Sequence, residues 1–281
     1  MLMTIDGNTT VLGVVGDPIE HTGSPAIHNF IAEKLGDNLV YVPFHVSKKG
    51  LSDAIRGAYE LNIRGLNITV PHKESVLQEV TELEDSALAI GAVNTVVKVK
   101  SGYKGFNTDF SGFMRQLDYY SVIVYNKPVI LLGAGGAAKA VMYALQKTGA
   151  SKVYVLNRSK NKAKEIFGNL KNVEILGFDE WNKIPGDKEY ICIQCTSVGL
   201  SPRDNECVIK DDEFFDLVSV GVDLIYKPKE TVFMKKIKER GREAYNGLRM
   251  LIYQAISAYE IFMDREVPNE IAEALYEELD P

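Results

Sequence analysis

Short apolar runs alternate with segments of helical periodicity along most of this chain. In the first half, the pattern predicts strands at 11–15, 40–46, 66–70, 94–99 and 103–106 and helices at 25–35, 51–61 and 109–120. In the second half, it predicts strands at 129–132, 152–156, 173–175, 190–193, 218–223 and 243–245, with helices between them. The C-terminal segment differs, because 248–263 and 268–279 are two helical patterns with no further strand. Short strands joined by helical crossovers predict parallel βαβ units, and therefore an α/β fold.

The order of these elements predicts two domains. We expect an N-terminal α/β substrate domain, completed by the C-terminal helices, over residues 1–110 and 248–281. A Rossmann dinucleotide-binding domain is expected over residues 111–247. The border then lies in the helix that follows Asp109, and the first domain is discontinuous in sequence.

Composition narrows the class of protein. The 281 residues are 46% hydrophobic and 25% charged, which is typical of a soluble globular protein. A formal net charge of -6 argues against nucleic acid as a partner. No run is long and apolar enough to span a bilayer, and the N-terminus lacks a secretory signal, so we expect no membrane association. Three cysteines indicate a reducing compartment, and Cys192 and Cys195 lack the second pair that a zinc site needs, so we expect a cytoplasmic protein with no metal.

The segment 65–73 combines a strand with a polar end. Its apolar side chains alternate with Asn67 and Thr69, which therefore share the opposite face of the strand. Pro71 suits the first turn of a helix, which would put Lys73 beside the positive end of the helix dipole. That is an unfavourable place for a lysine with a structural role. The segment therefore predicts a site for a small, oxygen-rich molecule, with an amine available for proton transfer.

A glycine-rich loop follows the apolar strand at 129–132. Its sequence, GAGGAA over 133–138, matches G-x-G-x-x-A between a buried strand and a helix expected at 137–148. Gly133 permits the tight turn, and Gly135 lets the backbone approach a pyrophosphate at the helix N-terminus. This context favours a dinucleotide site over a structural turn. The cofactor-binding residues expected in the loop are Gly133, Ala134, Gly135, Gly136 and Ala137.

The residues after the strand at 152–156 bear on the choice of dinucleotide. An NAD site commonly has an acidic residue there, whereas this chain has Asn157, Arg158 and Ser159, with Lys162 just beyond. A guanidinium and an amine attract a 2′-phosphate, so NADP(H) is predicted, with these four residues beside it. The alternative is that both cations are ordinary solvated charges, although cations at a helix start oppose the dipole.

Several segments together closely resemble shikimate dehydrogenases, in the order and spacing of that family and over nearly the whole chain. They lie at 16–29, 67–73, 91–95, 107–109, 133–138, 223–228 and 247–254. The resemblance implies a reversible, NADPH-dependent reduction of 3-dehydroshikimate to shikimate in aromatic amino-acid biosynthesis. It also implies that this small-molecule substrate binds between the two domains of a monomer or homodimer.

The resemblance assigns roles residue by residue. It implies that Lys73 and Asp109 are the catalytic pair, with Lys73 moving the proton at the C3 oxygen. It implies that the hydroxyls of Thr22 and Ser24 hold the substrate carboxylate. The other residues implied at the substrate are Asn67, Thr69, Asn94, Tyr226 and Gln254, and those beside the nicotinamide are Gly247 and Met250. Taken singly, Ser24 and Asp109 have a structural alternative, because each could cap a helix.

The chain departs from the family pattern at a few positions. Thr22 stands where serine is usual, and its extra methyl alters the room around the carboxylate or C1, where quinate carries a further hydroxyl. Gln194 replaces a usual asparagine near the nicotinamide, and Lys162 replaces a frequent arginine. The alternatives are therefore a quinate/shikimate dehydrogenase of broader specificity and a catalytically silent ligand-binding protein on the same fold. A folate-linked two-domain dehydrogenase fits the segments around Thr22 and Asn67 poorly.

Overall fold

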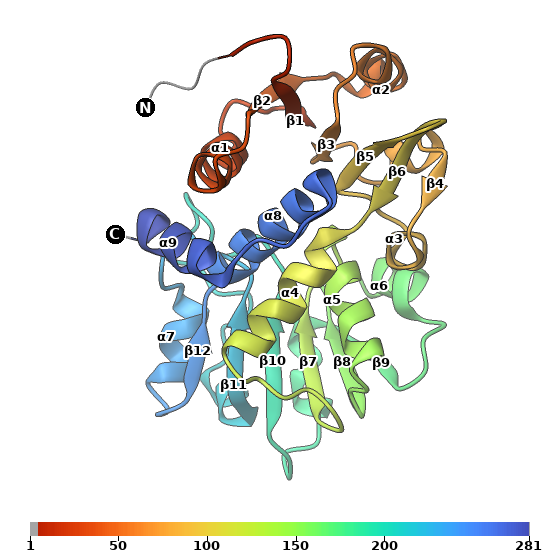
Figure 1. The fold of residues 1–281 in the computed structure, drawn as a ribbon. Helices are drawn as coiled ribbons and strands as arrows, with labels where there is room; N and C mark the ends of the chain where they lie inside the picture. Colours follow the sequence, from red (N-terminus) through yellow and green to blue (C-terminus); the bar gives the residue numbers. More distant parts are fainter. Residues whose placement is uncertain (1–4, 281) are drawn as a thin grey trace. The chain divides into compact units, whose positions relative to one another are not determined.

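A computed structural model describes residues 5–280, which form two compact units (Figure 1). The first unit contains the described residues up to Gly112 and from Leu251 onward, and the second runs from Phe113 to Met250. The chain passes from one unit to the other inside helix α4 (Thr108–Tyr119) and again inside helix α8 (Leu248–Met263). The borders expected at 110/111 and 247/248 lie beside these two crossings.

The first unit is built on a mixed six-stranded sheet with the order β2-β1-β3-β5-β6-β4. Its strands are β1 (Thr10–Gly16), β2 (Leu39–His45), β3 (Gly65–Ile68), β4 (Glu82–Leu83), β5 (Thr95–Val99) and β6 (Gly102–Phe106). Its helices include α1 (Ser24–Leu35), α2 (Leu51–Glu60), α3 (Asp85–Ile90) and α9 (Asn269–Leu279), with 3-10 turns η1 (Lys48–Gly50) and η2 (Ser75–Gln78). Strands β2, β1 and β3 are parallel, whereas β5 is antiparallel to both β3 and β6.

This topology gathers polar segments at one edge of the first sheet. The parallel strands β1, β2 and β3 all end there. Because β5 runs in the opposite direction, its first residue, Thr95, pairs with Asn67 of β3. Thr95 also pairs with Phe106, the last residue of β6. The segments that follow β3 and β6 and precede β5 therefore meet, as at the carboxyl edge of other α/β sheets.

The second unit is a doubly wound Rossmann sheet. All of its pairings are parallel, and its order is β12-β11-β10-β7-β8-β9. Its strands are β7 (Pro128–Leu132), β8 (Lys152–Leu156), β9 (Val173–Leu176), β10 (Tyr190–Gln194), β11 (Val218–Asp223) and β12 (Glu243–Tyr245). Its helices include α5 (Gly136–Lys147), α6 (Lys160–Phe167) and α7 (Val232–Lys238), with 3-10 turns η3 (Phe178–Lys183) and η4 (Asp212–Leu217). The run Val129–Leu132 is fully buried, as a central parallel strand requires.

Each unit has its own apolar core. In the first, Leu66 and Ile68 of β3 pack with Val96 of β5. In the second, Ile130 of β7 lies in a cluster with Phe214, among other buried residues. Both cores lie against their sheets, so the strand ends that carry polar residues are held by rigid scaffolds.

The prediction of a helix after Pro71 is wrong. Strand β3 ends at Ile68, Val70 is 65% exposed, and only the 3-10 turn η2 follows. The Lys73 carbonyl accepts the N–H of Val93 at 2.8 Å, whereas the N–H of Leu77, four residues on, bonds to the carbonyl of Glu74 at 3.3 Å instead of to Lys73 as in an α-helix. Lys73 therefore lies in a turn pinned to the segment before β5, and the helix-dipole argument for it does not apply.

The N-terminus of α1 also differs from the expectation. Ser24 is the first residue of the helix, Gly23 is its N-cap, and no side chain caps it. The N–H of Ser24 bonds to Thr22 Oγ1 at 3.3 Å, which leaves the Ser24 hydroxyl unused by the helix. The short elements α3 and β4 were not expected. The strand expected at 66–70 is confirmed but ends two residues earlier, at Ile68, and the remaining strands and helices with stated bounds are confirmed with ends that differ by at most one residue.

None of the helices within residues 5–280 has the length and apolar character that crossing a bilayer requires.

Candidate active site

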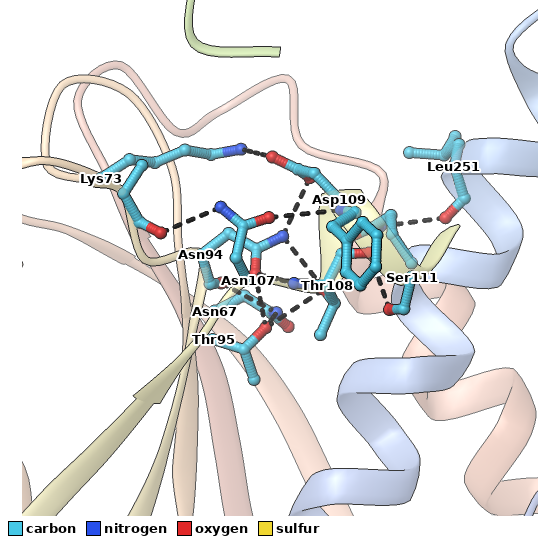
Figure 2. Close-up of polar contacts among 12 residues, drawn as sticks. Asn67, Lys73, Asn94, Thr95, Asn107, Thr108, Asp109, Ser111 and Leu251 are labelled. Atoms are coloured by element: carbon cyan, nitrogen blue, oxygen red, sulfur yellow. Dashed lines mark hydrogen bonds and ion pairs between the residues drawn. The ribbon is translucent and has the colours of Figure 1, made fainter. Parts of the chain in front are cut away.

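Lys73 and Asp109 form an ion pair at the polar edge of the first sheet (Figure 2). Lys73 Nζ lies 2.7 Å from Asp109 Oδ2, and the side chains are 30% and 13% exposed. The other carboxylate oxygen, Oδ1, accepts the side-chain amide of Asn94 at 2.9 Å. Each oxygen of Asp109 thus has its own donor, and the ammonium is held in a partly desolvated place that remains open to a ligand.

The capping alternative for Asp109 does not hold. The side-chain oxygen of Asn107, not that of Asp109, accepts a first-turn N–H of α4, from Phe110 at 3.3 Å. Asn107 is itself buried, and its amide donates to the carbonyl of Ala92 at 2.9 Å. With the helix start served by Asn107, the carboxylate of Asp109 is available to Lys73.

Asn94 is the anchor of this pair. Its side-chain oxygen accepts the backbone N–H of Thr108 at 2.8 Å and the hydroxyl of Thr95 at 3.0 Å. These two donors fix which end of the amide is oxygen, so the NH₂ group must face Asp109. Asn94 is 3% exposed, and burial makes this arrangement costly to rearrange.

Asn67 belongs to the same network (Figure 2). Its NH₂ group donates to the carbonyl of Asn94 at 3.2 Å and to the hydroxyl of Thr95 at 3.0 Å. Its side-chain oxygen accepts the hydroxyl of Tyr41 at 2.7 Å. Both N–H groups are therefore used, so toward a ligand Asn67 acts through its side-chain oxygen, as an acceptor for a hydroxyl.

Thr22 and Ser24 form a pair of hydroxyls before and at the start of α1. Thr22 Oγ1 donates to Ser24 Oγ at 3.3 Å, and both residues are partly exposed. The helix start beside them has no side-chain cap. Two hydroxyls at the positive end of a helix dipole are suited to a carboxylate.

The other expected substrate residues are not joined to the Lys73 network. Thr69 is half-buried after β3, and within the described chain its hydroxyl has no hydrogen-bond partner. Gln254 is half-buried on α8, where its amide donates to the carbonyl of Leu251 at 2.9 Å. Tyr226 lies in the second unit, 37% exposed, in the loop after β11. Their roles at a substrate stay predictions.

Asp223 supports the loop that carries Tyr226. One of its oxygens accepts the N–H of Ile225 at 2.9 Å, and the other accepts the hydroxyl of Thr231 at 2.6 Å. Burial raises the pKa of Asp223 to about 6, against the lowering effect of these two donors. The carboxylate at the end of β11 therefore has a structural role.

The glycine loop of the second unit fits a dinucleotide. Gly133 has φ +104, and a Cβ on it would lie 3.0 Å from Thr196, so a side chain would strain this turn. A Cβ on Gly135 or on Gly136 would meet nothing within 4 Å, which leaves the surface over the start of α5 open. Since no side chain caps α5, its first N–H groups face this opening, where a pyrophosphate fits.

In the segment after β8, two polar side chains stabilise the local structure and two cationic side chains are available to a ligand. Ser159 caps α6 by accepting the N–H of Lys162 at 3.3 Å, and Asn157 donates to the carbonyl of Ser159 at 2.8 Å. The side chains of Arg158 and Lys162 are exposed, and neither has a polar partner among residues 5–280. The two cations are thus free to bind an anion.

Three more residues near the expected nicotinamide position have structural roles. A Cβ on Gly247 would lie 2.1 Å from the carbonyl oxygen of Leu224, so only glycine fits there. The N–H of Met250 bonds to the side-chain oxygen of Gln116 at 2.7 Å. Gln194 accepts the N–H of Thr196 at 2.6 Å and donates to the carbonyl of Val198 at 3.0 Å. The side chain of Gln194 spans the turn after β10, so glutamine fits at this position where the family usually has asparagine.

Sequence reasoning missed Tyr41, Thr95 and Thr108, which complete the polar network. Thr108 lies between two residues that were expected to matter, so its neighbours were the only signal. Thr95 lies in the segment 91–95, which carries part of the family resemblance but gave it no role, whereas Tyr41 lies in an apolar strand outside those segments and carried no signal. Within the described residues, no cluster of three or more histidines, cysteines or acidic residues could hold a metal ion.

The fold and the two sites define a class: an oxidoreductase with a Rossmann domain for a dinucleotide and a separate α/β domain for a polar substrate. Residues 14–96 match the model of the shikimate dehydrogenase substrate binding domain, and residues 120–199 match that of shikimate / quinate 5-dehydrogenase. The shikimate dehydrogenase (NADP(+)) of Methanobrevibacter smithii is 36% identical over 96% of each chain.

Solved structures of shikimate dehydrogenases resemble this chain over nearly its whole length. A chorismate mutase/shikimate 5-dehydrogenase fusion protein from Clostridium acetobutylicum superposes with a TM-score of 0.91 at 36% identity, over 97% of this chain and 98% of that one. The shikimate 5-dehydrogenase of Thermus thermophilus, in complex with NADP(H) and shikimate, gives 0.80 at 30% identity, over 95% and 98%. The chain belongs to the shikimate dehydrogenase family.

Proposed function

We propose that this protein catalyses the reversible, NADPH-dependent reduction of 3-dehydroshikimate to shikimate, a step of aromatic amino-acid biosynthesis. The observation that carries this proposal is the ion pair of Lys73 and Asp109, locked by Asn94 at the polar edge of the first sheet. Family membership supports the same reaction, because relatives that cover nearly the whole chain include the shikimate dehydrogenase (NADP(+)) of Methanobrevibacter smithii and the Thermus thermophilus enzyme in complex with NADP(H) and shikimate.

The chemistry divides between the two units. NADPH, when bound, supplies a hydride to the carbonyl carbon of the substrate. The Lys73 ammonium gives a proton to the carbonyl oxygen, which becomes the C3 hydroxyl of shikimate. Asp109 keeps the amine oriented and stabilises its charged form, and solvent returns the proton to Lys73 after each turnover. In the oxidation of shikimate the same amine, uncharged, accepts the hydroxyl proton.

Substrate recognition uses the remaining polar groups of the first unit. The hydroxyls of Thr22 and Ser24 bind the carboxylate, aided by the uncapped start of α1. The side-chain oxygen of Asn67 accepts a ring hydroxyl, and Asn94 aligns Asp109. We propose further ring contacts by Thr69 and Gln254, and a contact by Tyr226 from the second unit.

The cofactor site favours NADP(H) over NAD. The open glycine loop at the start of α5 supports pyrophosphate binding, with Gly247 and Met250 proposed beside the nicotinamide. The exposed cations Arg158 and Lys162 are proposed to bind the 2′-phosphate, while Ser159 and Asn157 shape the turn that presents them. The protein is proposed to act as a monomer or a homodimer.

Equilibrium binding of shikimate tests the substrate site. Ser24→Ala should raise the dissociation constant about tenfold, because a charge-assisted hydrogen bond to a carboxylate is lost. Ser101→Ala, at an exposed position in the β5–β6 turn, is the matched control and should bind shikimate like the wild type. Equal affinity of all three proteins would remove Ser24 from the site.

A further inference from the structure

Tyr41 lies between the two parts of the proposed substrate site. It is the third residue of β2 and is 1% exposed. Its hydroxyl donates to the side-chain oxygen of Asn67 at 2.7 Å. On the other side, the phenol faces Ser24: burial raises the pKa of Tyr41, and the nearby Ser24 hydroxyl opposes that rise. Tyr41 is therefore the only described side chain that these contacts link to both the carboxylate part and the ring-hydroxyl part of the site.

The position of Tyr41 is itself strongly fixed. The ring of His28 stacks on it, with centroids 4.2 Å apart and planes 3° from parallel. The side-chain amide of Asn29 donates to the Tyr41 carbonyl at 2.9 Å, and its oxygen accepts the Tyr41 N–H at 2.9 Å. Both contacts come from α1, the helix that begins at Ser24. Tyr41 thus fixes the position of β3 relative to α1, because it contacts both.

We propose that Tyr41 is a positioning residue that sets the distance between Ser24 and Asn67, an inference that rests on the substrate proposed above. When a carboxylate binds, the Ser24 hydroxyl turns toward it, while the Tyr41 hydroxyl continues to donate to Asn67. The Asn67 oxygen then stays aimed at the ring hydroxyl, because one of its lone pairs is held by Tyr41. Without this donor, the acceptor for the ring hydroxyl loses its alignment with the carboxylate part of the site.

Tyr41→Phe tests this role, since it removes one oxygen and keeps the stacked ring. The KM for shikimate should rise about three- to tenfold, the effect of one hydrogen bond, with kcat changed less than about threefold and the KM for NADP⁺ unchanged. The matched control is Tyr103→Phe, which removes a hydroxyl that is equally buried in the same unit but bonds to the carbonyl of Ile63 at 2.6 Å. This control should lower the melting temperature without changing the KM for shikimate.

A double variant tests the route of the effect. If Tyr41 acts through Asn67, adding Tyr41→Phe to Asn67→Ala should change the KM for shikimate by less than about twofold. A full additional loss in the double variant would overturn the role in positioning Asn67. An unchanged KM in Tyr41→Phe, with a lowered melting temperature, would overturn the inference while leaving the proposed function intact. A wild-type protein that neither binds nor oxidises shikimate would overturn both.

Discussion

Replacing Lys73 by methionine removes the amine while keeping a side chain of similar length. If Lys73 is the general acid and base, kcat should fall about 10²- to 10⁴-fold, the usual contribution of a positioned proton donor. That loss corresponds to about 3–5 kcal/mol in the activation barrier. The affinity for shikimate should change by less than about fivefold, because the carboxylate and ring-hydroxyl contacts stay in place.

The effect of this substitution on stability should be much smaller. Lys73 and Asp109 are 30% and 13% exposed, so solvent screens part of their attraction. Asp109 also keeps its hydrogen bond from Asn94, which satisfies one of its oxygens. We therefore expect a decrease of about 1 kcal/mol in the free energy of unfolding.

The assay is steady-state oxidation of shikimate by NADP⁺, with the dissociation constant of shikimate and the melting temperature measured on the same samples. Lys49→Met, at an exposed lysine of η1 in the same unit, is the matched control and should behave like the wild type. A Lys73→Met protein that keeps a near-wild-type kcat would refute the assignment of Lys73. So would a loss of turnover that is explained entirely by a failure to bind shikimate.

Two other predictions address cofactor choice and acid stability. Arg158→Ala should raise the KM for NADP⁺ about tenfold or more and leave that for NAD⁺ within about twofold, because only NADP⁺ carries the 2′-phosphate; equal effects on both cofactors would contradict the assignment. Burial lowers the pKa of His28 from 6.5 to about 3, so the unfolded chain binds a proton near pH 6.5 that the folded protein does not accept until about pH 3. The free energy of unfolding should therefore fall with decreasing pH across this window, by about 1.4 kcal/mol per pH unit from this one group. Denaturant unfolding at several pH values should show a flatter dependence of the free energy of unfolding on pH in His28→Phe than in the wild type. The raised pKa of Asp223 acts in the opposite direction, equally in the variant and in the wild type. An identical slope in the two proteins would show that His28 is not responsible.

The strands and most helices could be predicted because their apolar residues recur with a regular period. The run Val129–Leu132 is an example, since it is fully buried at the centre of a parallel sheet. The predicted helix after Pro71 does not form because of a tertiary contact. The carbonyl of Lys73 bonds to Val93, twenty residues away in sequence, and no local pattern reveals that competition with a helix.

The same reason explains which site residues could be found. Lys73 and Asp109 stand in segments whose polar residues interrupt the pattern, and the family resemblance selected them. Tyr41 and Thr95 enter the network only because β2, β1, β3 and β5 lie side by side, with Asn67 opposite Thr95. That register is a property of the folded sheet. The division of labour between Asn107, which caps α4, and Asp109, which pairs with Lys73, likewise required the structure.

Substrate oxidation by the wild-type protein tests the central claim most directly. Initial rates should be measured with shikimate and with quinate, each with NADP⁺ and with NAD⁺. We predict that shikimate with NADP⁺ gives the highest kcat/KM of the four pairs, with one 3-dehydroshikimate formed for each NADPH. The absence of NADPH formation with shikimate, or a clear preference for quinate or for NAD⁺, would contradict the account.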